Sequence, residues 1–291
     1  MRRHHRLSPC KINLLLNILG RRPDGFHELE TVLQPVPIHD ELQFEPAQAG
    51  LELTCNHPRL PVDQRNLVHR AASAFLSEAR LGEGVRIHLE KRIPMEAGLG
   101  GGSGNAASTL LGLNELWGHP LQSQQLQRLA AALGSDVVFF LEDRPALAHG
   151  RGELVEWQDP FALLRGCGLL LVHPGFGVST PWAYRELARF PNALKGNPGR
   201  APKFMASLRG TDWSAAAGQF YNGLEAPVLE KYPLLALYQE HLRSQGALVA
   251  MMSGSGSTTF ALSANQEEAE RLRESLLVKF GASCWTAVVS L

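Results

Sequence analysis

A glycine-rich stretch in the first half of the chain constrains the fold more strongly than any other feature. Residues 94–107 read PMEAGLGGGSGNAA, and four of the five residues 100–104 are glycine. Before this stretch, apolar residues alternate with polar ones in the two-residue period of a half-buried strand, at Val85, Ile87, Leu89 and Ile93. After it, apolar residues recur at helical spacing, at Ala106, Leu110, Leu113 and Trp117. The sequence therefore predicts a strand, a glycine loop and a helix.

A loop of this kind at the start of a helix is suited to binding phosphate. The first N–H groups of a helix have no partner within it, so we expect Ser103, Gly104 or Asn105 to lie near the helix start with backbone amides pointing outward. Glycines allow phosphate oxygens to approach these amides, and the helix dipole favours negative charge there. We expect a phosphate site that needs no lysine of its own.

Two other phosphate-binding loops are excluded, and one structural alternative stays open. No Gly-Lys-Ser/Thr follows the glycines, so the P-loop pattern is absent. The dinucleotide pattern has a weak match at Gly102, Gly104 and Ala107, but its first glycine lies too far beyond the strand, and residues 121–133 contain no acidic residue to bind a ribose. The open alternative is a tight strand-to-helix turn, which would need one or two glycines rather than four.

The length and charge of the chain indicate a two-domain protein with a small ligand. With 291 residues, the chain is long enough for two hydrophobic cores. Its character changes near residue 155, so we expect domains at residues 1–155 and 156–291. The 28 basic residues are balanced by 28 acidic ones, which argues against nucleic-acid binding and against a membrane-surface protein. We expect a small-molecule substrate and a monomer or weak homodimer.

The cysteines and the N-terminus favour a cytoplasmic protein. The four cysteines show no CxxC or metal spacing and are expected to be reduced thiols: Cys10, Cys55, Cys167 and Cys284. The basic residues 1–6 and the apolar run 12–19 imitate a secretory signal, but polar residues interrupt the run and no small-residue cleavage site follows. No apolar segment reaches the length of a membrane span. We expect residues 1–6 to form a solvated tail.

Polar side chains near the N-terminus are candidates for binding a substrate. In the strand expected over residues 10–18, Lys11 and Asn13 share one face and apolar residues share the other. The turn that follows delivers Phe26 and His27, a ring and a hydrogen-bonding side chain suited to a planar base. Each assignment has a simpler alternative: Lys11 as a solvated residue of an edge strand, and Phe26 as a packing residue.

Asp136 is the candidate catalytic base. It follows a helix expected over residues 123–133 and ended by Gly134, and it precedes the apolar run 137–141. If the glycine loop holds a triphosphate, Asp136 could accept the proton of an attacking hydroxyl. Lys11 could keep that carboxylate ionised and stabilise the transferred phosphoryl group. The alternative for Asp136 is an N-cap carboxylate that accepts backbone hydrogen bonds.

The remaining patterns predict further strands and helices, with a split βαβ arrangement in the second half. In the first half, strands are expected near residues 31–36, 41–44 and 51–55, and Asn66 stands at an N-cap position. In the second half, strands are expected near residues 169–173, 247–252, 258–262 and 282–289, and helices from Thr180–Pro181, over 212–220, over 225–245 and from Asn265. Residues 190–203 are expected to form a loose surface excursion. The loop 253–257, SGSGS, is a hairpin turn or places backbone amides near the same ligand. Without the extra helices, the order is β-α-β-β-α-β.

Together these motifs resemble the GHMP small-molecule kinases, and the match runs nearly end to end. It rests on PCKINL at 9–14, RPDGFH at 22–27, NLV at 66–68, the glycine loop, LGSDV at 133–137 and SGSG at 253–256. The Pro-Asp-Gly-aromatic-His element is the most diagnostic, whereas the glycine loop alone marks only the superfamily. The resemblance implies an α+β two-domain fold, with an N-terminal domain like domain 2 of ribosomal protein S5 and a ferredoxin-like C-terminal domain.

The resemblance also implies an activity and a set of site residues. The expected reaction transfers the γ-phosphoryl group of ATP, accompanied by Mg2+, to the 2-hydroxyl of 4-diphosphocytidyl-2-C-methyl-D-erythritol in the non-mevalonate isoprenoid pathway. Asp136 and Lys11 fall at the positions of the catalytic pair. The implied ATP-binding positions are Asn66, Lys91, Pro94, Gly98, Leu99, Gly100, Gly101, Gly102, Ser103 and Gly104, and the implied substrate-binding positions are Asn13, Phe26, His27, Thr180 and Tyr184. Two alternatives stay open: a GHMP kinase for another alcohol, such as a sugar or homoserine, and a catalytically weak relative that only binds ligand.

The chain departs from the family pattern at four positions. In the glycine loop, Ala97 replaces a common glycine and Gly104 a common serine. Val138 stands where the family usually has a proline after the Asp-Val pair. Gly223 replaces the aspartate of an Asn-Asp-Leu-Glu element. Ala97 would restrict the loop if its position required a positive φ, and Gly104 would remove a phosphate contact.

Overall fold

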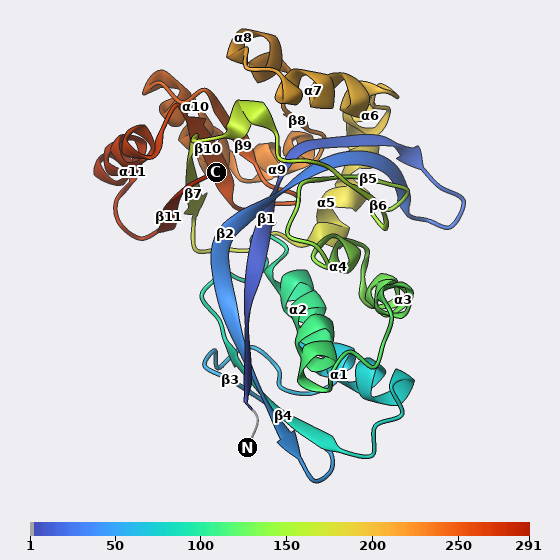
Figure 1. Ribbon diagram of the computed structural model, residues 1–291. Helices are drawn as coiled ribbons and strands as arrows, with labels where there is room; N and C mark the ends of the chain where they lie inside the picture. The colour runs from blue at the N-terminus through green and yellow to red at the C-terminus, as the bar shows by residue number, and fades with distance from the viewer. Residues whose placement is uncertain (1–2) are drawn as a thin grey trace. The chain divides into compact units, whose positions relative to one another are not determined.

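Two long strands open the part of the chain that the structure describes, residues 3–291 of this computed structural model (Figure 1). They are β1 (His4–Arg21) and β2 (His27–Ala47). The strand expected over residues 10–18 is therefore longer at both ends, and the two strands expected near 31–36 and 41–44 are parts of one strand.

The basic residues near the N-terminus contact carboxylates from elsewhere in the chain. The pairs are Arg3–Glu45 at 2.6 Å, His4–Glu115 at 2.7 Å, His5–Glu41 at 3.5 Å and Arg6–Glu115 at 2.5 Å. The prediction of a tail is wrong for residues 4–6, which belong to β1, because carboxylates distant in the sequence provide partners that the local sequence does not reveal. Met1 and Arg2, which belong to the same prediction, lie outside the described residues.

The chain forms two units, each assembled from separate stretches. The first unit contains the described residues up to Cys10 together with residues 38–93 and 100–143. The second contains residues 11–37, 94–99 and 144–291. Strands β1 and β2 therefore each contribute residues to both units. The single boundary near residue 155 stays a prediction, since the units interleave along the chain.

The first unit contains β3 (Leu51–Cys55), β4 (Gly84–Glu90) and parts of β1 and β2, which belong to one seven-stranded sheet, together with four helices. Strand β3 runs parallel to β4, and β2 pairs antiparallel with β4 on its other side. The alternation expected before the glycine loop is confirmed, because Val85, Ile87 and Leu89 are buried. The helices are α1 (Leu67–Glu78), α2 (Gly101–Leu116), α3 (Ser123–Leu133) and α4 (Ser135–Phe139), and α1 packs along α2 (Figure 1).

The second unit contains a four-stranded sheet of the kind expected from the sequence. Its strands are β7 (Gly168–His173), β9 (Val249–Met252), β10 (Thr259–Ser263) and β11 (Trp285–Ser290), in the order β11-β7-β10-β9 with antiparallel neighbours. Helices α10 (Pro233–Ser244) and α11 (Gln266–Phe280) lie side by side against it (Figure 1) and share a core with Leu170, Val172 and Ala261. The split βαβ order and the ferredoxin-like arrangement are confirmed.

Shorter elements complete the second unit. Strand β5 (Ala146–His149) pairs with β2 and with β6 (Leu154–Trp157), and β8 (Tyr221–Asn222) pairs in parallel with β1. The other helices are α5 (Thr180–Glu186), α6 (Pro191–Leu194), α7 (Arg200–Arg209), α8 (Trp213–Ala216) and α9 (Glu225–Lys231), with short 3-10 helices η1 (Ala162–Leu164), η2 (Leu187–Arg189) and η3 (Ala217–Gln219).

The loose excursion expected over residues 190–203 is only partly correct. Helix α6 lies within it, and α7 begins inside its C-terminal end. The carboxylate of Glu30 accounts for the start of α7, because it accepts hydrogen bonds from the N–H groups of Gly199 and Ala201 at 3.1 and 3.3 Å. That contact joins residues far apart in the sequence, so the local pattern could not reveal it.

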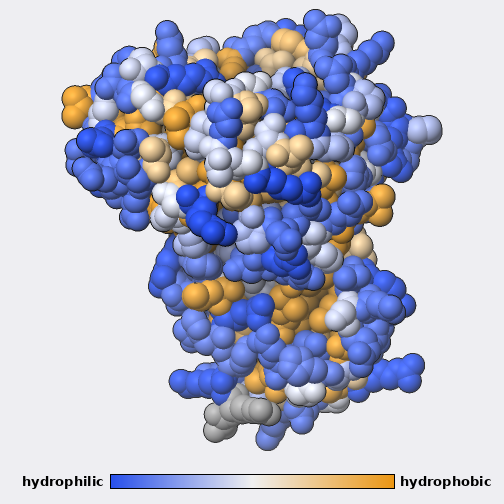
Figure 2. Space-filling model, turned by 45° about the horizontal axis from the view of Figure 1, so that its top comes forward, coloured by the Kyte–Doolittle hydropathy of each residue, from blue (hydrophilic) through white to orange (hydrophobic). Residues whose placement is uncertain are grey.

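Within residues 3–291, none of the helices combines the length and the apolar composition that a bilayer crossing requires. On the face shown in Figure 2, hydrophilic residues predominate and hydrophobic ones are interspersed among them. Exposed apolar side chains of this scattered kind are common on folded proteins.

Candidate functional site

The glycine loop turns through alternating residues with positive φ. Glu96, Gly98 and Gly100 have φ values of 52°, 76° and 69°, and α2 begins directly afterwards at Gly101. The helix therefore starts slightly earlier than the expected position near Ser103, because Gly100 adopts a left-handed conformation that glycine permits. Gly100 has no side chain to cap the helix, so the amides of the first turn are left to water or a ligand.

The two departures in this loop have structural reasons. Ala97 lies between residues with positive φ without being one of them, and its carbonyl accepts a hydrogen bond from the Thr258 N–H at 3.1 Å. A side chain at Gly104 would come within 2.5 Å of the Pro9 carbonyl oxygen and 3.2 Å of Ser8 Oγ. Position 97 therefore does not require glycine, and position 104 has no room for a serine while β1 keeps its place.

Lys11 is buried in β1, and its ammonium group donates hydrogen bonds to Asn13 and to the glycine loop. Only 3% of the residue is exposed. Its Nζ donates to Asn13 Oδ1 at 2.6 Å and to the Gly98 carbonyl at 2.9 Å. Removing a charge from water costs several kcal/mol unless hydrogen bonds replace its hydration, and both bonds contribute to that replacement. The alternative of a solvated edge-strand lysine is wrong, because the side chain is buried rather than in solvent.

Asn13 is also held by hydrogen bonds to residues other than Lys11. Its Nδ2 donates to Thr31 Oγ1 at 2.9 Å, and Thr31 Oγ1 donates to the Leu15 carbonyl at 2.6 Å. Its backbone N–H reaches Ser253 Oγ at 3.4 Å. These contacts leave Asn13 Oδ1 turned toward Lys11. The shared strand face predicted for Lys11 and Asn13 is confirmed, and the pair is rigidly held.

The Gly/Ser loop between β9 and β10 packs against Lys11. It is a hairpin turn as expected, since β9 and β10 pair antiparallel on either side of it. Ser253 Oγ donates to the Gly98 carbonyl at 3.0 Å, and a side chain at Gly254 would lie 3.3 Å from Lys11 Nζ. Thr180 Oγ1 and Ser255 Oγ share a hydrogen bond of 2.7 Å. The hairpin thus also contacts several predicted site residues.

Phe26, His27 and Tyr184 are the predicted aromatic and imidazole groups of the substrate site. The rings of His27 and Tyr184 pack with centroids 5.1 Å apart and planes inclined by 30°. Burial, and then the positive charge of Arg21, lower the pKa of His27 below its ordinary value of 6.5. His27 is therefore neutral at neutral pH, with one nitrogen as donor and the other as acceptor. Phe26 is 53% exposed, so core packing is not its role.

Asp136 lies half-buried in the first turn of α4. The N-cap of this helix is Gly134, so the alternative of Asp136 as an N-cap carboxylate is wrong. Val137 and Val138, which follow it, are buried, as expected for the apolar run. Asp136 belongs to the first unit and Lys11 to the second. Their catalytic roles stay predictions.

Asn66 and Lys91, two predicted ATP-binding residues, use their polar groups within the fold. Asn66 is the N-cap of α1, as expected: Oδ1 accepts a hydrogen bond from the Val68 N–H at 2.9 Å, and Nδ2 donates to the Pro61 carbonyl at 2.7 Å. The Lys91 side chain is 5% exposed, and its Nζ donates to Asn105 Oδ1 at 3.1 Å. Their contacts with ATP stay predictions.

Asp40, which sequence reasoning missed, is the centre of a buried network around the start of α2. Its carboxylate accepts hydrogen bonds from the N–H groups of Arg92 and Ile93 at 2.7 and 2.9 Å and from Asn105 Nδ2 at 2.9 Å. It also pairs with the Lys91 ammonium group. Because Asn105 belongs to α2, the network fixes the start of the helix against β2. Nothing in the local sequence separates Asp40 from surface carboxylates.

Asn222 holds the Gly/Ser loop and was also missed. Its Nδ2 donates to the carbonyls of Met252 and Gly254 at 2.8 and 2.7 Å, and only 2% of the residue is exposed. At the neighbouring Gly223, a side chain would approach the Ala193 carbonyl oxygen to 3.3 Å. A side chain there would require its neighbours to shift by a few tenths of an ångström. The only sequence signal for Asn222 was that it precedes Gly223, a position that departs from the family pattern.

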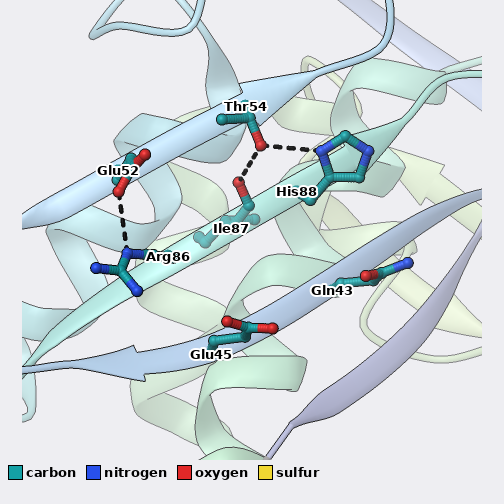
Figure 3. Close-up of a pocket in the computed structure, with 7 residues that line it drawn as sticks. All are labelled: Gln43, Glu45, Glu52, Thr54, Arg86, Ile87 and His88. Carbon is teal, nitrogen blue, oxygen red and sulfur yellow. Dashed lines mark hydrogen bonds and ion pairs between the residues drawn. The ribbon is translucent and has the colours of Figure 1, made fainter.

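The pocket in Figure 3 is lined by none of the predicted site residues. It has a volume of about 190 Å³ and is lined by Gln43, Glu45, Glu52, Thr54, Arg86, Ile87 and His88, from β2, β3 and β4. Four of its polar side chains pair with one another: Arg86 Nε with Glu52 Oε2 at 3.1 Å, and Thr54 Oγ1 with His88 Nδ1 at 2.9 Å. The pocket therefore gives no separate indication of phosphate or nucleoside binding.

Comparison with known families gives the class of the protein. Residues 66–144 match the GHMP kinases N terminal domain, and residues 203–282 match the GHMP kinases C terminal domain. The chain belongs to the GHMP kinase family. The resemblance and the fold expected from it are confirmed, the protein is a small-molecule kinase, and ATP is the phosphoryl donor that such a kinase uses.

Two relatives of the chain carry the same name. It is 42% identical to a 4-diphosphocytidyl-2-C-methyl-D-erythritol kinase from Synechococcus sp. (strain JA-3-3Ab), over 94% of this chain and 89% of the relative. It is also 42% identical to a protein of the same name from Pelotomaculum thermopropionicum, over 91% of each. A crystal structure of 4-(cytidine 5'-diphospho)-2C-methyl-D-erythritol kinase matches with a TM-score of 0.77 at 34% identity, covering 99% of each chain.

A homoserine kinase has a similar fold. The structure from Cytophaga hutchinsonii matches with a TM-score of 0.77 at 20% identity, covering 100% of this chain and 95% of the other. At this identity the likeness extends to the fold alone. Similarity of fold therefore does not choose between acceptor alcohols, and that choice depends on the side chains of the site.

Proposed function

We propose that this chain transfers the γ-phosphoryl group of ATP to the 2-hydroxyl of 4-diphosphocytidyl-2-C-methyl-D-erythritol, a step in the non-mevalonate isoprenoid pathway. The observation that carries the proposal is Lys11, whose buried ammonium group is fixed by Asn13 and by the carbonyl of Gly98. A cation held at the glycine loop is suited to stabilising a phosphoryl group in transfer. The shared name of relatives at 42% identity supports the substrate.

Recognition of a cytosine base is assigned to Phe26, His27 and Tyr184. The neutral imidazole of His27 offers one donor and one acceptor, so it can donate to the ring nitrogen of cytosine or accept from its amino group. The exposed ring of Phe26 and the ring of Tyr184 supply apolar faces for stacking. Thr180 and Asn13 add polar groups for the remainder of the substrate. These side chains favour a cytidine substrate over a sugar or homoserine.

The reaction requires a base, a stabilising cation and a phosphate site. Asp136 accepts the proton of the 2-hydroxyl, and Lys11 stabilises the negative charge of the phosphoryl group. ATP supplies that group, with a bond formed between the hydroxyl oxygen and the γ-phosphorus as the bond to the β-phosphate oxygen breaks. The backbone amides of Gly101, Gly102 and Ser103, at the start of α2, bind phosphate oxygens.

Mg2+ is expected to enter with the phosphates of ATP. Among residues 3–291, no three or more His, Cys, Asp or Glu side chains are grouped as metal ligands. Mg2+ commonly keeps several waters and uses one or two carboxylates together with substrate phosphates.

The cytoplasmic location and a monomeric or weakly dimeric state belong to the same proposal. The scattered cysteines support a reducing compartment. The equal numbers of basic and acidic residues, 28 each, support a small-molecule enzyme over a protein that associates with nucleic acid.

The proposal is tested by Asp136→Asn in an ADP-release assay with the cytidine substrate. The variant removes the proton acceptor and keeps the shape of the side chain, so we expect turnover to fall by roughly 10²- to 10⁴-fold while binding of the substrate is retained. A calorimetric titration measures the binding, and a panel of sugars and homoserine measures acceptor choice.

A matched control is Asp159→Asn, at an aspartate whose side chain is 97% exposed and pairs with Arg144. It should turn over like the parent protein. Near-normal turnover in Asp136→Asn would remove Asp136 as the base. Faster phosphorylation of another alcohol than of the cytidine substrate, or failure of cytidine diphosphate to compete, would overturn the substrate assignment.

A further inference from the structure

The hairpin between β5 and β6 presents a guanidinium group to the ring of Phe26. His149 and Leu154 are the last paired residues of the hairpin, and its turn contains Gly150 and Gly152 with φ values of 69° and 105°. These glycines give the turn a conformation that other residues rarely adopt. Arg151 lies between them, so the backbone determines the direction in which its side chain leaves.

Three contacts hold this turn and its arginine in place. The Leu29 N–H donates to the Gly150 carbonyl at 2.9 Å, which ties the turn to the start of β2. The Arg151 N–H donates to Glu153 Oε2 at 2.6 Å. Arg151 Nε lies 3.4 Å from Glu153 Oε1. The arginine is therefore anchored at its backbone and at its guanidinium group.

Arg151 lies over Phe26. Its guanidinium carbon is 4.7 Å from the centroid of the ring, within the range of a cation–π contact. Phe26 is nevertheless 53% exposed and is one of the few large apolar side chains with such exposure. An exposed phenylalanine at the end of a turn would otherwise sample several rotamers. A cation on one face restricts the ring and leaves the rest of it accessible to a ligand.

We propose that Arg151 is a positioning residue that fixes Phe26 for stacking on the base of a nucleoside-diphosphate substrate. The proposal rests on the function proposed above, because it requires that Phe26 contacts the base. Arg151 acts through the ring of Phe26, and Glu153 acts by holding Arg151. Its effect therefore falls on substrate binding and leaves the phosphoryl-transfer step and the ATP site unchanged.

The test is a double-mutant cycle of Arg151→Met and Phe26→Ala, with KM for the cytidine substrate, KM for ATP and kcat measured in each protein. Methionine retains much of the length of arginine and removes the charge. In the parent background, we expect Arg151→Met to raise KM for the cytidine substrate by between about two- and fivefold, with kcat and KM for ATP unchanged. In the Phe26→Ala background, Arg151→Met should have no further effect.

Two further variants separate positioning from a general structural effect. Arg151→Lys keeps a cation near the ring and should recover part of the lost affinity. Arg273→Met is the matched control: the Arg273 side chain is 38% exposed, close to the 35% of Arg151, and is ion-paired with Glu270 at 2.8 Å. It should leave all three parameters unchanged, and thermal unfolding of every variant monitors folding.

The outcomes distinguish this proposal from the proposed function. If the parent protein does not phosphorylate the cytidine substrate, the function itself fails. If the parent protein is active, an unchanged KM in Arg151→Met overturns the positioning role. Equal effects of Arg151→Met with and without Phe26 overturn it as well, because Arg151 would then act independently of the ring. A fall in kcat, or a rise in KM for ATP, also overturns it.

Discussion

At Lys11, the cost of burying a positive charge is offset by acceptors from two parts of the chain. Asn13 supplies one from the same strand, and Gly98 supplies the other from 87 residues away. The first acceptor could be predicted, because residues two apart share a face of a strand. The second could not, because no local pattern links β1 to the glycine loop. Asp40 and Arg151 escaped prediction for the same reason, since their partners are distant in the sequence.

His27 gives a prediction of pH dependence. Burial and the charge of Arg21 lower its pKa, so the ring keeps an acceptor nitrogen to a lower pH than an ordinary histidine. Arg21→Gln removes the charge that disfavours protonation, so the pKa of His27 should rise toward 6.5. An NMR titration of the imidazole C–H signals measures this, with His27→Gln identifying the resonance.

The same substitution should affect binding of the cytidine substrate. The facing groups that bear on His27 are Arg21 and the Tyr184 ring. In Arg21→Gln, the rise in KM on acidification should begin at a higher pH than in the parent protein. Arg271→Gln, at an exposed position of α11, is the control. A pKa of His27 that is unchanged or lower in Arg21→Gln would contradict the assignment.

At the scale of elements, the β9–β10 hairpin limits which residues can stand beside Lys11. Gly254 has a φ of 56°, and a side chain there would lie 3.1 Å from the Gly98 carbonyl oxygen and 3.3 Å from both Lys11 Nζ and Asn13 Oδ1. We expect Gly254→Ala to displace Lys11 and to lower kcat by about tenfold or more, since small misplacements of catalytic groups are costly. Steady-state kinetics measure the loss.

Gly281→Ala is the control for the backbone effect of that substitution. Gly281 has a φ of 83°, and a side chain there would have no heavy atom within 4 Å. Both variants should lose roughly 1 kcal/mol of unfolding free energy from the left-handed conformation, but Gly281→Ala should keep the parent kcat. Equal kcat values in the two variants would refute the contact between the hairpin and Lys11.

Elements with a strong local pattern were predictable, and those set by distant contacts were not. The helix ended by Gly134, the strand before the glycine loop and the last hairpin follow from periodicity and caps. The ends of β1 depend on carboxylates such as Glu115, and the start of α7 depends on Glu30. Local periodicity contains no information on either contact.

At the scale of the whole molecule, the two units interleave along the chain. We therefore expect that a fragment of residues 1–155 lacks part of a hydrophobic core. Leu16, Ile18 and Leu29 belong to a core cluster whose other buried members come from the second half of the chain, among them Val178, Ala183, Leu187, Leu224 and Val228. Burial of three such side chains contributes about 5–9 kcal/mol, comparable to the total stability of a domain. In the fragment, residues 11–37 should lose their native protection.

Hydrogen exchange of the fragment and of the full chain measures this prediction. Residues 11–37 should exchange much faster in the fragment, whereas residues 38–93, which belong to the first unit, provide an internal comparison. Native-like protection of residues 11–37 in the fragment would contradict this prediction, because these parts of β1 and β2 would then fold without the C-terminal elements. That result would support the boundary predicted near residue 155.

The sequence predicted the family of the protein more completely than it predicted the residues and contacts of the site. The motifs that resemble GHMP kinases occur at six places along the chain, and the family matches cover residues 66–144 and 203–282. Sequence identified Lys11, Asn13 and Asp136 as candidates, because their residue types suit phosphoryl transfer. It could not identify Asn222, which holds the Gly/Ser loop, or Arg151, which contacts the ring of Phe26.

The long-range contacts of β1 also affect how the chain can fold while it is being synthesised. Leu15 pairs with Tyr221 in β8, and the Asn13 N–H meets Ser253 across 240 residues. At a synthesis rate of roughly 5–20 residues per second, Ser253 follows Asn13 by about 12–48 seconds. During that interval the apolar face of a newly made strand lacks its later partners, so the nascent chain must be kept from aggregating until the last third emerges from the ribosome.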